Sequence, residues 1–228
     1  MALIRSILFT LIFYTGSLPI VLSGFPAAVF GRRPVRAVVW TWAHWHRLCA
    51  RWLLGIRSRM SGPVPPGQYL IACKHQSMFE TVEVLILFDH PVVVMKRELS
   101  DMPIWGWVAR KYGVIGVDRE GSAAALRALM QAAREAVQTG RSIVIFPEGT
   151  RVPVGEQPPL RAGFAALYKM LGLPVLPVAL NSGRIWPRQS LIKRAGVVDW
   201  QLAEALPPKM ERTAIEAAVH HAINGLEQ

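Results

Sequence analysis

Short runs of apolar residues alternate with longer helical segments along most of the chain. A short apolar run bounded by turn residues is typical of a buried strand, and a longer segment with apolar residues every three to four positions indicates a helix. The runs predict strands over residues 68–71, 91–95, 113–117, 142–146, 175–181 and 195–206. The longer segments predict helices over residues 82–88, 122–138 and 211–226, with another opening near residue 161. This alternation predicts an α/β fold in which helices flank a sheet.

The chain opens on an almost wholly apolar stretch over residues 1–30, with Arg5 near its start and Pro19 among its interruptions. A spanning helix needs about 20 predominantly apolar residues, and Pro19 would kink a helix formed here. We therefore expect a bent hairpin or a re-entrant membrane anchor. A cleaved export signal is the alternative, because such signals also combine a basic start with an apolar centre. Residues 24–28, however, form a poor small-residue cleavage site.

A further helix is expected over residues 35–54, where tryptophan and arginine are interleaved. Tryptophan favours the membrane boundary and arginine favours lipid headgroups, so this pattern is typical of an interfacial helix. On such a helix His44 and His46 would point about 200° apart, since each residue turns by ~100°. We therefore interpret them as interfacial polar residues and not as a shared metal site.

Glycine and proline fill residues 62–67, Gly-Pro-Val-Pro-Pro-Gly, and indicate a linker. The linker separates the apolar start of the chain from the strands and helices that follow. We therefore expect two units: a membrane anchor with an interfacial helix over residues 1–61, and an α/β catalytic domain over residues 62–228.

The composition also favours a membrane surface. Hydrophobic residues make up 52% of the sequence, and the formal net charge is +11. Apolar and basic character together suit anionic membrane lipids as partners. Nucleic acid is not expected as a partner, because the early arginines alternate with tryptophan and leucine and no nucleic-acid-binding motif is recognisable. Cys49 and Cys73 do not indicate a disulfide framework, so we expect the cytoplasmic face of an inner membrane of the bacterial type.

Residues 72–81, Ala-Cys-Lys-His-Gln-Ser-Met-Phe-Glu-Thr, lie where a strand gives way to a helix. Ser77 and Glu80 match a capping box, in which the serine caps the helix and the glutamate reaches back to it. With the helix starting at Ser77, His75 precedes it, and Glu80 can reach the imidazole. On this stretch alone two interpretations stay open: an ordinary helix cap beside a partly exposed histidine, or a general base oriented by a carboxylate.

A second motif lies downstream at residues 146–151, Phe-Pro-Glu-Gly-Thr-Arg. It follows a strand and forms a turn that exposes a carboxylate, a hydroxyl and a guanidinium. Two more strand blocks are residues 113–119, Gly-Val-Ile-Gly-Val-Asp-Arg, and residues 175–181, Val-Leu-Pro-Val-Ala-Leu-Asn. Together and in this order, the four blocks resemble the lysophospholipid acyltransferase family, the glycerophosphate and lysophosphatidate O-acyltransferases. One departure is Glu80, since that family usually has aspartate in the first block.

The resemblance implies a mixed sheet flanked by helices and an acyl transfer in phospholipid biosynthesis. The acyl group would pass from acyl-CoA or acyl carrier protein to the free hydroxyl of lysophosphatidic acid, giving phosphatidic acid. His75 would take the hydroxyl proton, while Glu80 holds its tautomer and stabilises the imidazolium. The hydroxyl would attack the thioester directly, so no covalent enzyme intermediate, metal or bound cofactor is expected.

The resemblance also implies how the acceptor is bound. Arg119 and Arg151 would clamp its phosphate, because guanidinium is suited to bidentate phosphate contacts. Glu148 would contact the glycerol or order the arginines, and Gly149 would let the backbone approach closely. Thr150, in the same turn, is also expected to bind the substrate.

Two other features leave alternatives open. Lys96 follows an apolar strand, and it either recognises phosphate or belongs to a solvated charge cluster at a turn. Residues 103–108, Pro-Ile-Trp-Gly-Trp-Val, are apolar and aromatic, and they form either a wall for an acyl chain or a lipid-facing patch.

Rival functions remain as well. Cys73 shares a strand face with His75, so it is either the nucleophile of a covalent enzyme or a small buried strand residue. The acceptor could be another lyso-lipid, such as a lyso-ornithine lipid, which lacks phosphate. The protein could also be a catalytically inactive membrane-binding protein, which the presence of both the base and residues 146–151 argues against.

Overall fold

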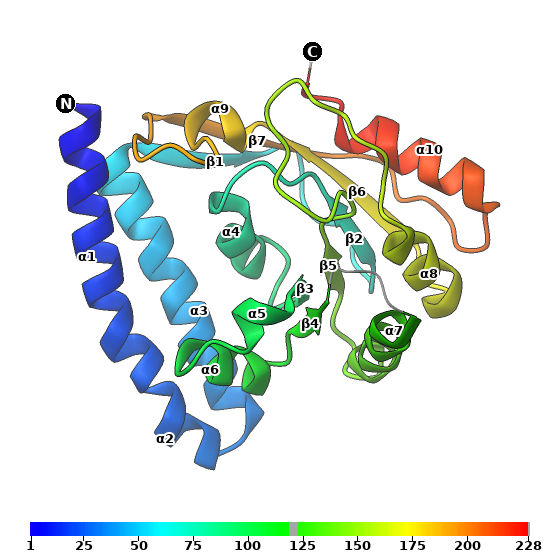
Figure 1. The fold of residues 1–228 in the computed structure, drawn as a ribbon, viewed down its shortest axis with the longest axis horizontal. Helices are drawn as coiled ribbons and strands as arrows, with labels where there is room; N and C mark the ends of the chain where they lie inside the picture. The colour runs from blue at the N-terminus through cyan, green and yellow to red at the C-terminus, as the bar shows by residue number, and fades with distance from the viewer. Residues whose placement is uncertain (119–122, 228) are drawn as a thin grey trace.

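The computed structural model of the protein describes residues 1–118 and 123–227. Within these residues one seven-stranded sheet has the strand order β1-β7-β6-β2-β5-β3-β4 (Figure 1). The strands are β1 (Ile56–Met60), β2 (Leu70–Cys73), β3 (Val92–Lys96), β4 (Ile115–Val117), β5 (Ile143–Ile145), β6 (Val175–Leu180) and β7 (Gly196–Leu202). Neighbouring strands are parallel, except that β6 and β7 are antiparallel. The sheet is therefore mixed, and the predicted α/β fold is confirmed.

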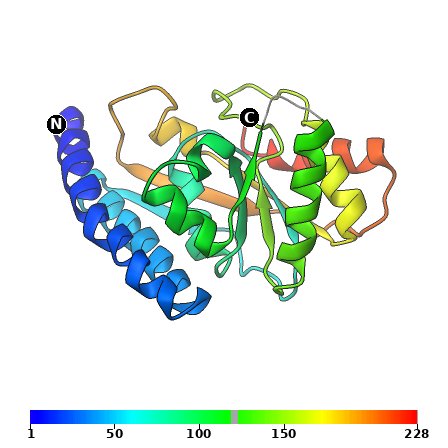
Figure 2. The same cartoon turned by 60° about the horizontal axis from the view of Figure 1, so that its bottom comes forward.

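Helices cover both faces of the sheet (Figures 1 and 2). They are α1 (Ala2–Leu22), α2 (Gly24–Val29), α3 (Arg32–Cys49), α4 (Phe79–Leu87), α5 (Arg97–Ser100), α6 (Trp105–Tyr112), α7 (Ala123–Val137), α8 (Ala162–Leu171), α9 (Ser182–Ile185) and α10 (Arg212–Ile223). A π-helical turn, η1 (Ala50–Leu54), continues α3. One hydrophobic core joins one face of the sheet to α1, α3, α4 and α6, and a second core joins the other face to α7, α8 and α10.

Strand β2 shows how the sequence builds these two cores. Successive side chains of a strand point to opposite faces, and all four residues of β2 are buried. Ile71 and Cys73 belong to the core on the α3 and α4 side, whereas Leu70 and Ala72 belong to the core on the α7 and α8 side. A sheet covered on both faces requires continuous apolar strands of this kind.

Helices α1 and α3 lie side by side, with α2 at the turn between them (Figure 1). Pro19 lies inside α1, which continues to Leu22. Helical hydrogen bonding resumes beyond the proline, because the Ser23 N–H donates to the Pro19 carbonyl at 3.0 Å. The N-terminal hairpin is therefore formed by α1 with α3, and the kink expected at Pro19 does not end the first helix.

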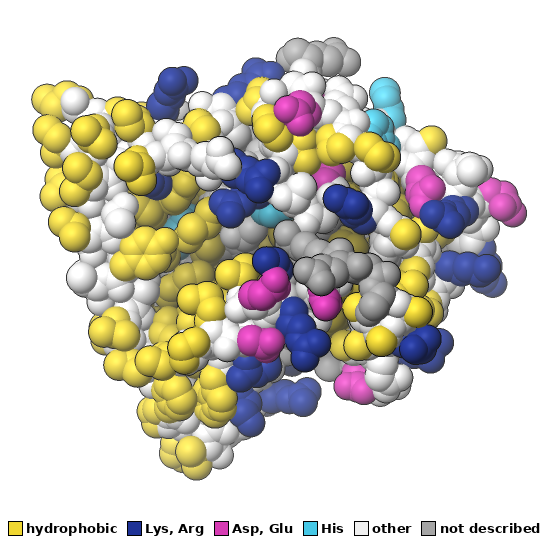
Figure 3. Space-filling model, viewed as in Figure 1, with side chains coloured by type: hydrophobic (Ala, Val, Ile, Leu, Met, Phe, Trp, Pro, Cys, Tyr) yellow, Lys and Arg dark blue, Asp and Glu magenta, His cyan; other side chains and the backbone are white. Residues whose placement is uncertain are grey.

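The outer face of α1 is apolar. Its exposed residues include Leu3, Ile4, Ile7, Leu8, Leu11 and Leu18. Figure 3 shows hydrophobic side chains gathered over this helix, along the left edge of the molecule. By length and composition, the helical stretch Ala2–Val29 could cross a membrane. These features indicate that the protein associates with a membrane.

Helix α3 differs from the expected interfacial helix. Trp40 and Trp52, in α3 and in η1, are exposed. The indole N–H groups of Trp42 and Trp45 instead donate to α1, at 3.1 and 3.2 Å. His46, expected at an interface, is fully buried. The expectation for His46 is wrong because α1 covers this face of α3.

Strand β1 was not predicted from the sequence. Its residues alternate between buried Ile56 and more exposed positions such as Arg57. It pairs with β7 and so belongs to the sheet. The sheet thus begins before residue 62, where the second unit was expected to start, and the division into two units stays a prediction.

Candidate active site

The first motif forms the turn that joins β2 to α4. The strand ends at Cys73 and the helix begins at Phe79. The capping box had predicted that the helix would begin at Ser77, two residues earlier. The two hydrogen bonds nevertheless resemble those of a capping box. Ser77 Oγ accepts the Phe79 N–H at 2.9 Å, and Glu80 Oε1 accepts the Ser77 N–H at 2.6 Å. The turn is therefore locked by its own side chains before the helix starts.

This turn brings His75 against Glu80. His75 Nδ1 lies 2.9 Å from Glu80 Oε1, which is the contact that the spacing allowed. His75 is 6% exposed and Glu80 is fully buried. With Nδ1–H donating to the carboxylate, the basic lone pair of the neutral imidazole is on Nε2. The ring of Phe146, from the second motif, stacks on the imidazole with a centroid distance of 4.3 Å.

The carboxylate of Glu80 is held by further donors. It accepts the N–H groups of Gln76 and Ser77 and the hydroxyls of Ser77 and Ser182, at 2.6–2.9 Å. Burial raises the pKa of this carboxyl, but the hydrogen bond and charge of His75 and the bonds from Ser182 and Ser77 together lower the pKa below its ordinary value. Glu80 is therefore a carboxylate at neutral pH, able to orient the imidazole and to stabilise its protonated form.

Cys73 lies close to this pair but fits a structural role. It is fully buried, and burial, with the charges of Glu80 and Glu148, raises the pKa of its thiol well above the ordinary value. The thiolate is the nucleophilic form of cysteine, so a thiol held in its neutral form is a poor nucleophile.

Among the described residues, no group of three or more His, Cys, Asp or Glu side chains could hold a metal ion.

The second motif forms a turn after β5 that packs behind His75. Glu148 is 2% exposed; its Oε1 accepts from Lys74 Nζ at 2.7 Å and its Oε2 accepts the His75 N–H at 2.9 Å. Burial raises the pKa of Glu148, against the opposing effect of Lys74. We expected Glu148 to contact the glycerol or to order the arginines. In the structure Glu148 pairs with Lys74 and holds the backbone of His75, and its expected role toward the substrate stays a prediction.

The remaining residues of this turn lie near its surface. Gly149 has φ +72°, a conformation that favours glycine, and an added Cβ would lie 2.9 Å from Arg161 Cγ. Thr150 and Arg151 are half-buried. The Arg151 carbonyl accepts from Arg188 Nη1 at 2.9 Å. The conformation and close packing of the turn therefore explain why residue 149 is glycine. The substrate-binding roles of Gly149, Thr150 and Arg151 stay predictions.

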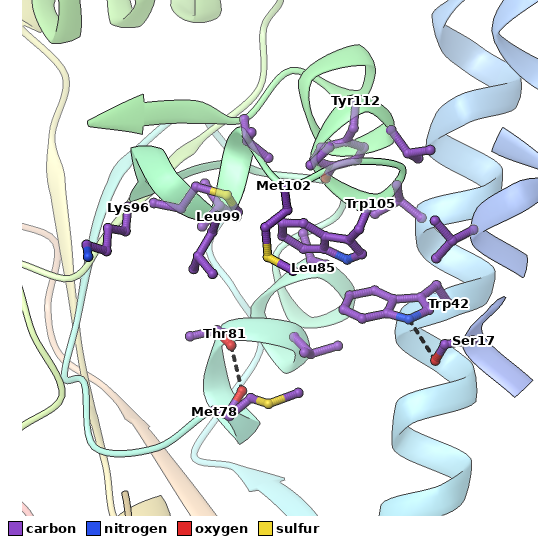
Figure 4. Close-up of a pocket in the computed structure, with 18 of the residues that line it drawn as sticks. Ser17, Trp42, Met78, Thr81, Leu85, Lys96, Leu99, Met102, Trp105 and Tyr112 are labelled. Carbon is purple, nitrogen blue, oxygen red and sulfur yellow. Dashed lines mark hydrogen bonds between the residues drawn. The ribbon is translucent and has the colours of Figure 1, made fainter. Parts of the chain in front are cut away.

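Arg119 and Lys96 complete the predicted binding set. Arg119 lies outside the described residues. Lys96 ends β3, its Nζ lies 2.6 Å from Glu98 Oε1, and its side chain is 45% exposed. In Figure 4 its ammonium points away from the apolar side chains beside it. A phosphate contact and a solvated ion pair are both compatible with this position.

An apolar pocket of about 370 Å³ opens beside His75 (Figure 4). Residues of α1, α3, α4, β3 and α6 line it. His75 and Phe146 are in its wall, and Trp42, Trp105 and Tyr112 supply much of its aromatic surface. Trp105 belongs to the aromatic stretch at residues 103–108 for which a wall or a lipid-facing patch was expected. The N-terminal helices thus form one side of a pocket whose other side carries the histidine.

Comparison with known proteins identifies the family. The family model for acyltransferases matches residues 56–181. The 1-acyl-sn-glycerol-3-phosphate acyltransferase of Pseudomonas aeruginosa is 34% identical over 210 residues, which are 89% of this chain and 80% of that protein. The chain belongs to the acyltransferase family. The resemblance seen in the four sequence blocks is therefore confirmed.

Other members of the acyltransferase family match over shorter lengths. The 1-acyl-sn-glycerol-3-phosphate acyltransferase of Helicobacter pylori is 30% identical over 61% of this chain and 60% of that protein. The alpha form of Mus musculus is 30% identical over 59% of this chain and 49% of that protein. The crystal structure of the 1-acyl-sn-glycerophosphate (LPA) acyltransferase PlsC from Thermotoga maritima has a TM-score of 0.76 and 23% identity, and the match covers 100% of this chain and 98% of that one. This structural similarity supports the fold, including the N-terminal helices.

Several residues of this acyltransferase site have no signal in the local sequence. Ser182, in α9, donates to Glu80 across 102 positions of sequence. Asn224, just after α10, accepts from Lys74 across 150 positions. Lysine is almost never fully buried unless paired. The one available clue was Lys74 itself, a lysine three residues after the strand predicted over residues 68–71.

Proposed function

We propose that the protein transfers an acyl group from a thioester to the free hydroxyl of 1-acyl-sn-glycerol 3-phosphate, lysophosphatidic acid, to give phosphatidic acid. The observation that carries the proposal is the His75–Glu80 pair at the wall of an apolar pocket. Membership of the acyltransferase family supports it, as does the similarity to the 1-acyl-sn-glycerol-3-phosphate acyltransferase of Pseudomonas aeruginosa.

In the proposed reaction His75 acts as general base. Its Nε2 takes the proton from the acceptor hydroxyl while the oxygen attacks the thioester carbonyl carbon. The carbon–sulfur bond then breaks, and the imidazolium returns the proton to the leaving thiolate. Glu80 remains a carboxylate throughout and stabilises the imidazolium. This scheme uses no enzyme-bound acyl group, metal or bound cofactor.

In this proposal the pocket and two arginines bind different parts of the acceptor. The acyl chain occupies the apolar pocket beside Trp42, Trp105 and Tyr112, because burial of a hydrocarbon chain is worth about 0.8 kcal/mol per CH₂. Arg119 and Arg151 bind the phosphate, because guanidinium groups suit bidentate contacts. The donor is acyl-CoA or acyl carrier protein.

The setting of the reaction is the cytoplasmic face of a bacterial-type inner membrane. The exposed apolar face of α1 enters the lipid layer, and the net charge of +11 attracts anionic headgroups. Cys49 and Cys73 are both unpaired thiols, which suits a reducing compartment. The acceptor can then reach the pocket from the membrane.

Purified protein in detergent, incubated with a panel of lyso-lipids and acyl donors, tests the proposal directly. We expect phosphatidic acid by mass from lysophosphatidic acid with at least one of the two donors, and at least about 100-fold slower formation by the His75→Ala variant. The phosphate-free lyso-ornithine lipid provides the acceptor control. Acylation of that lipid alone, or of no lipid at all, would contradict the proposed acceptor.

A further inference from the structure

Lys74, the residue directly before His75, is fully buried. Its ammonium donates to Glu148 Oε1 at 2.7 Å, to Asn224 Oδ1 at 2.6 Å and to the Glu156 carbonyl at 3.0 Å. A buried ammonium is tolerated only when it is paired and its donors are satisfied. The position of Lys74 therefore depends on all three acceptors, and one of them comes from the end of α10.

Asn224 is held so that it serves as this acceptor. Its Nδ2 donates to the His220 carbonyl at 2.7 Å, one turn earlier on α10. The amide nitrogen is thereby engaged, and the amide oxygen is turned toward Lys74. Asn224 is 6% exposed, so little water is available to replace it.

Glu227 contacts the other neighbour of His75. Its Oε1 accepts from Gln76 Nε2 and lies 3.8 Å from Lys74 Nζ, and its side chain is 2% exposed. Its Oε2 accepts the Gly155 N–H, in the loop after the second motif, at 2.5 Å. The other end of the Gln76 amide, Oε1, accepts the Gly183 N–H at 3.0 Å.

Lys74 is connected to His75, the proposed base, through Glu148. Lys74 pairs with Glu148, and Glu148 accepts the backbone N–H of His75 at 2.9 Å. The carbonyl of His75 accepts the Val152 N–H at 2.7 Å. The backbone of His75 is therefore held by Glu148 and Val152. The side chains of the residues before and after it contact the segment that follows α10.

We propose that Asn224 and Glu227 are positioning residues of the acyl transfer: they hold Lys74 and Gln76, and through them they keep the imidazole of His75 aligned with the acceptor hydroxyl. The inference rests on the proposed function. Neither residue lines the apolar pocket, so their loss affects proton transfer and leaves binding of the acceptor chain intact.

The test compares Glu227→Ala with Glu216→Ala. Both variants remove a carboxylate in or just after α10. Glu216, however, pairs with Arg212 at 3.1 Å, and among the described residues it makes no hydrogen bond or ion pair with the first motif. We expect kcat of Glu227→Ala to fall by about 10- to 100-fold, because small misplacements of catalytic groups have effects of this size. The acceptor KM and the unfolding temperature should match those of Glu216→Ala. Glu227→Gln, which keeps the length and one acceptor, should recover part of kcat.

A second readout needs no substrate. In protein carrying ¹³C-labelled histidine, the His75 imidazole signal is assigned by its loss in His75→Ala. It should shift or split in Glu227→Ala and in Asn224→Ala, and stay in place in Glu216→Ala. This readout decides the inference even if the wild-type protein proves inactive toward lysophosphatidic acid, an outcome that would contradict the proposed function alone.

Two results would overturn the inference. One is a Glu227→Ala variant with wild-type kcat and an unmoved imidazole signal. The other is a loss of kcat that appears only together with a lowered unfolding temperature, while the imidazole signal of the folded protein stays in place. That second result would make the segment after α10 a support of the fold and not of the base.

Discussion

His46 and His75 are both buried, but in opposite surroundings. His46 is fully buried, and among the described residues neither of its ring nitrogens has a hydrogen-bond partner. The rings of Phe9, Phe13 and Trp186 surround it. His75 is nearly as buried, but its Nδ1 meets the carboxylate of Glu80 at 2.9 Å.

The comparison shows what makes a buried histidine useful as a base. Burial, with the nearby charge of Arg47, lowers the pKa of His46 to about 3, so this ring stays neutral and acts as an apolar filler. An adjacent carboxylate has the opposite effect on an imidazole, because it stabilises the charged form. Burial alone therefore keeps an imidazole neutral, so that it does not take up a proton. A carboxylate at Nδ1 stabilises the protonated ring and so allows it to act as a base.

The largest effect is expected from His75→Ala. Loss of the general base should lower kcat by about 10²–10⁴-fold, with little change in the acceptor KM because the pocket is left in place. His46→Phe and Cys73→Ala, measured by the same steady-state assay, should keep most of the activity. Near-normal turnover in His75→Ala would remove this residue from the mechanism, and an inactive but folded Cys73→Ala would revive a covalent route.

The next largest effect is expected from a change in Glu80, the carboxylate partner of His75. Glu80→Gln keeps the size of the side chain but removes its charge, so the imidazolium formed during the reaction loses its stabilisation. We expect kcat to fall by about 10²-fold or more. Glu80→Asp, which restores the residue usual in the family, should retain more activity than Glu80→Gln. A fully active glutamine variant would show that the carboxylate only caps the turn.

A smaller effect separates acceptor binding from proton transfer. Arg151→Ala should raise the KM for lysophosphatidic acid by about 10- to 150-fold, since a charged hydrogen bond is worth ~1.5–3 kcal/mol. The value of kcat should change far less than in His75→Ala. Lysine should rescue only in part, because it offers no planar fork. If Arg151→Ala and Arg119→Ala both keep the wild-type KM, the phosphate clamp is wrong.

The smallest effect concerns His46 and appears in stability. The unfolded chain binds a proton at His46 below its ordinary pKa of 6.5, whereas the folded protein does so only near 3. Stability is therefore lost as pH falls from 6.5 toward 3. Between pH 7 and 5 the wild type should lose about 2 kcal/mol more unfolding free energy than His46→Phe. Chemical unfolding in detergent at the two pH values measures this, and parallel losses in both proteins would show that His46 is solvated.

Much of the fold could be predicted from the sequence because its central strands are buried on both faces. Runs such as Leu70–Cys73 and Val175–Leu180 are uniformly apolar for that reason. Strand β1 escaped prediction because Arg57 and Arg59 interrupt it at an edge of the sheet. The position of His46 escaped because the pattern of α3 alone does not reveal that α1 covers one of its faces.

The site divides in the same way. The His75–Glu80 contact was predictable because both residues belong to one turn between a strand and a helix. The inward position of Glu148 was not, since its partner Lys74 lies 74 positions earlier. Ser182 and Asn224 lie far from the first motif in sequence, and only the folded chain brings them into contact with it. Contacts between residues close in sequence, such as His75 and Glu80, can therefore be predicted from the sequence. The distant residues that hold this pair in place cannot.

A double-mutant cycle on His75 and Glu80 tests the central claim most directly. If Glu80 contributes to turnover only by orienting and stabilising the imidazole, its loss has no further effect once the imidazole is absent. The kcat of His75→Ala/Glu80→Gln should then equal that of His75→Ala alone. Residues that act as a unit show this non-additivity. A double variant slower than His75→Ala by the full factor measured for Glu80→Gln would mean that the two residues act independently, and would contradict the account.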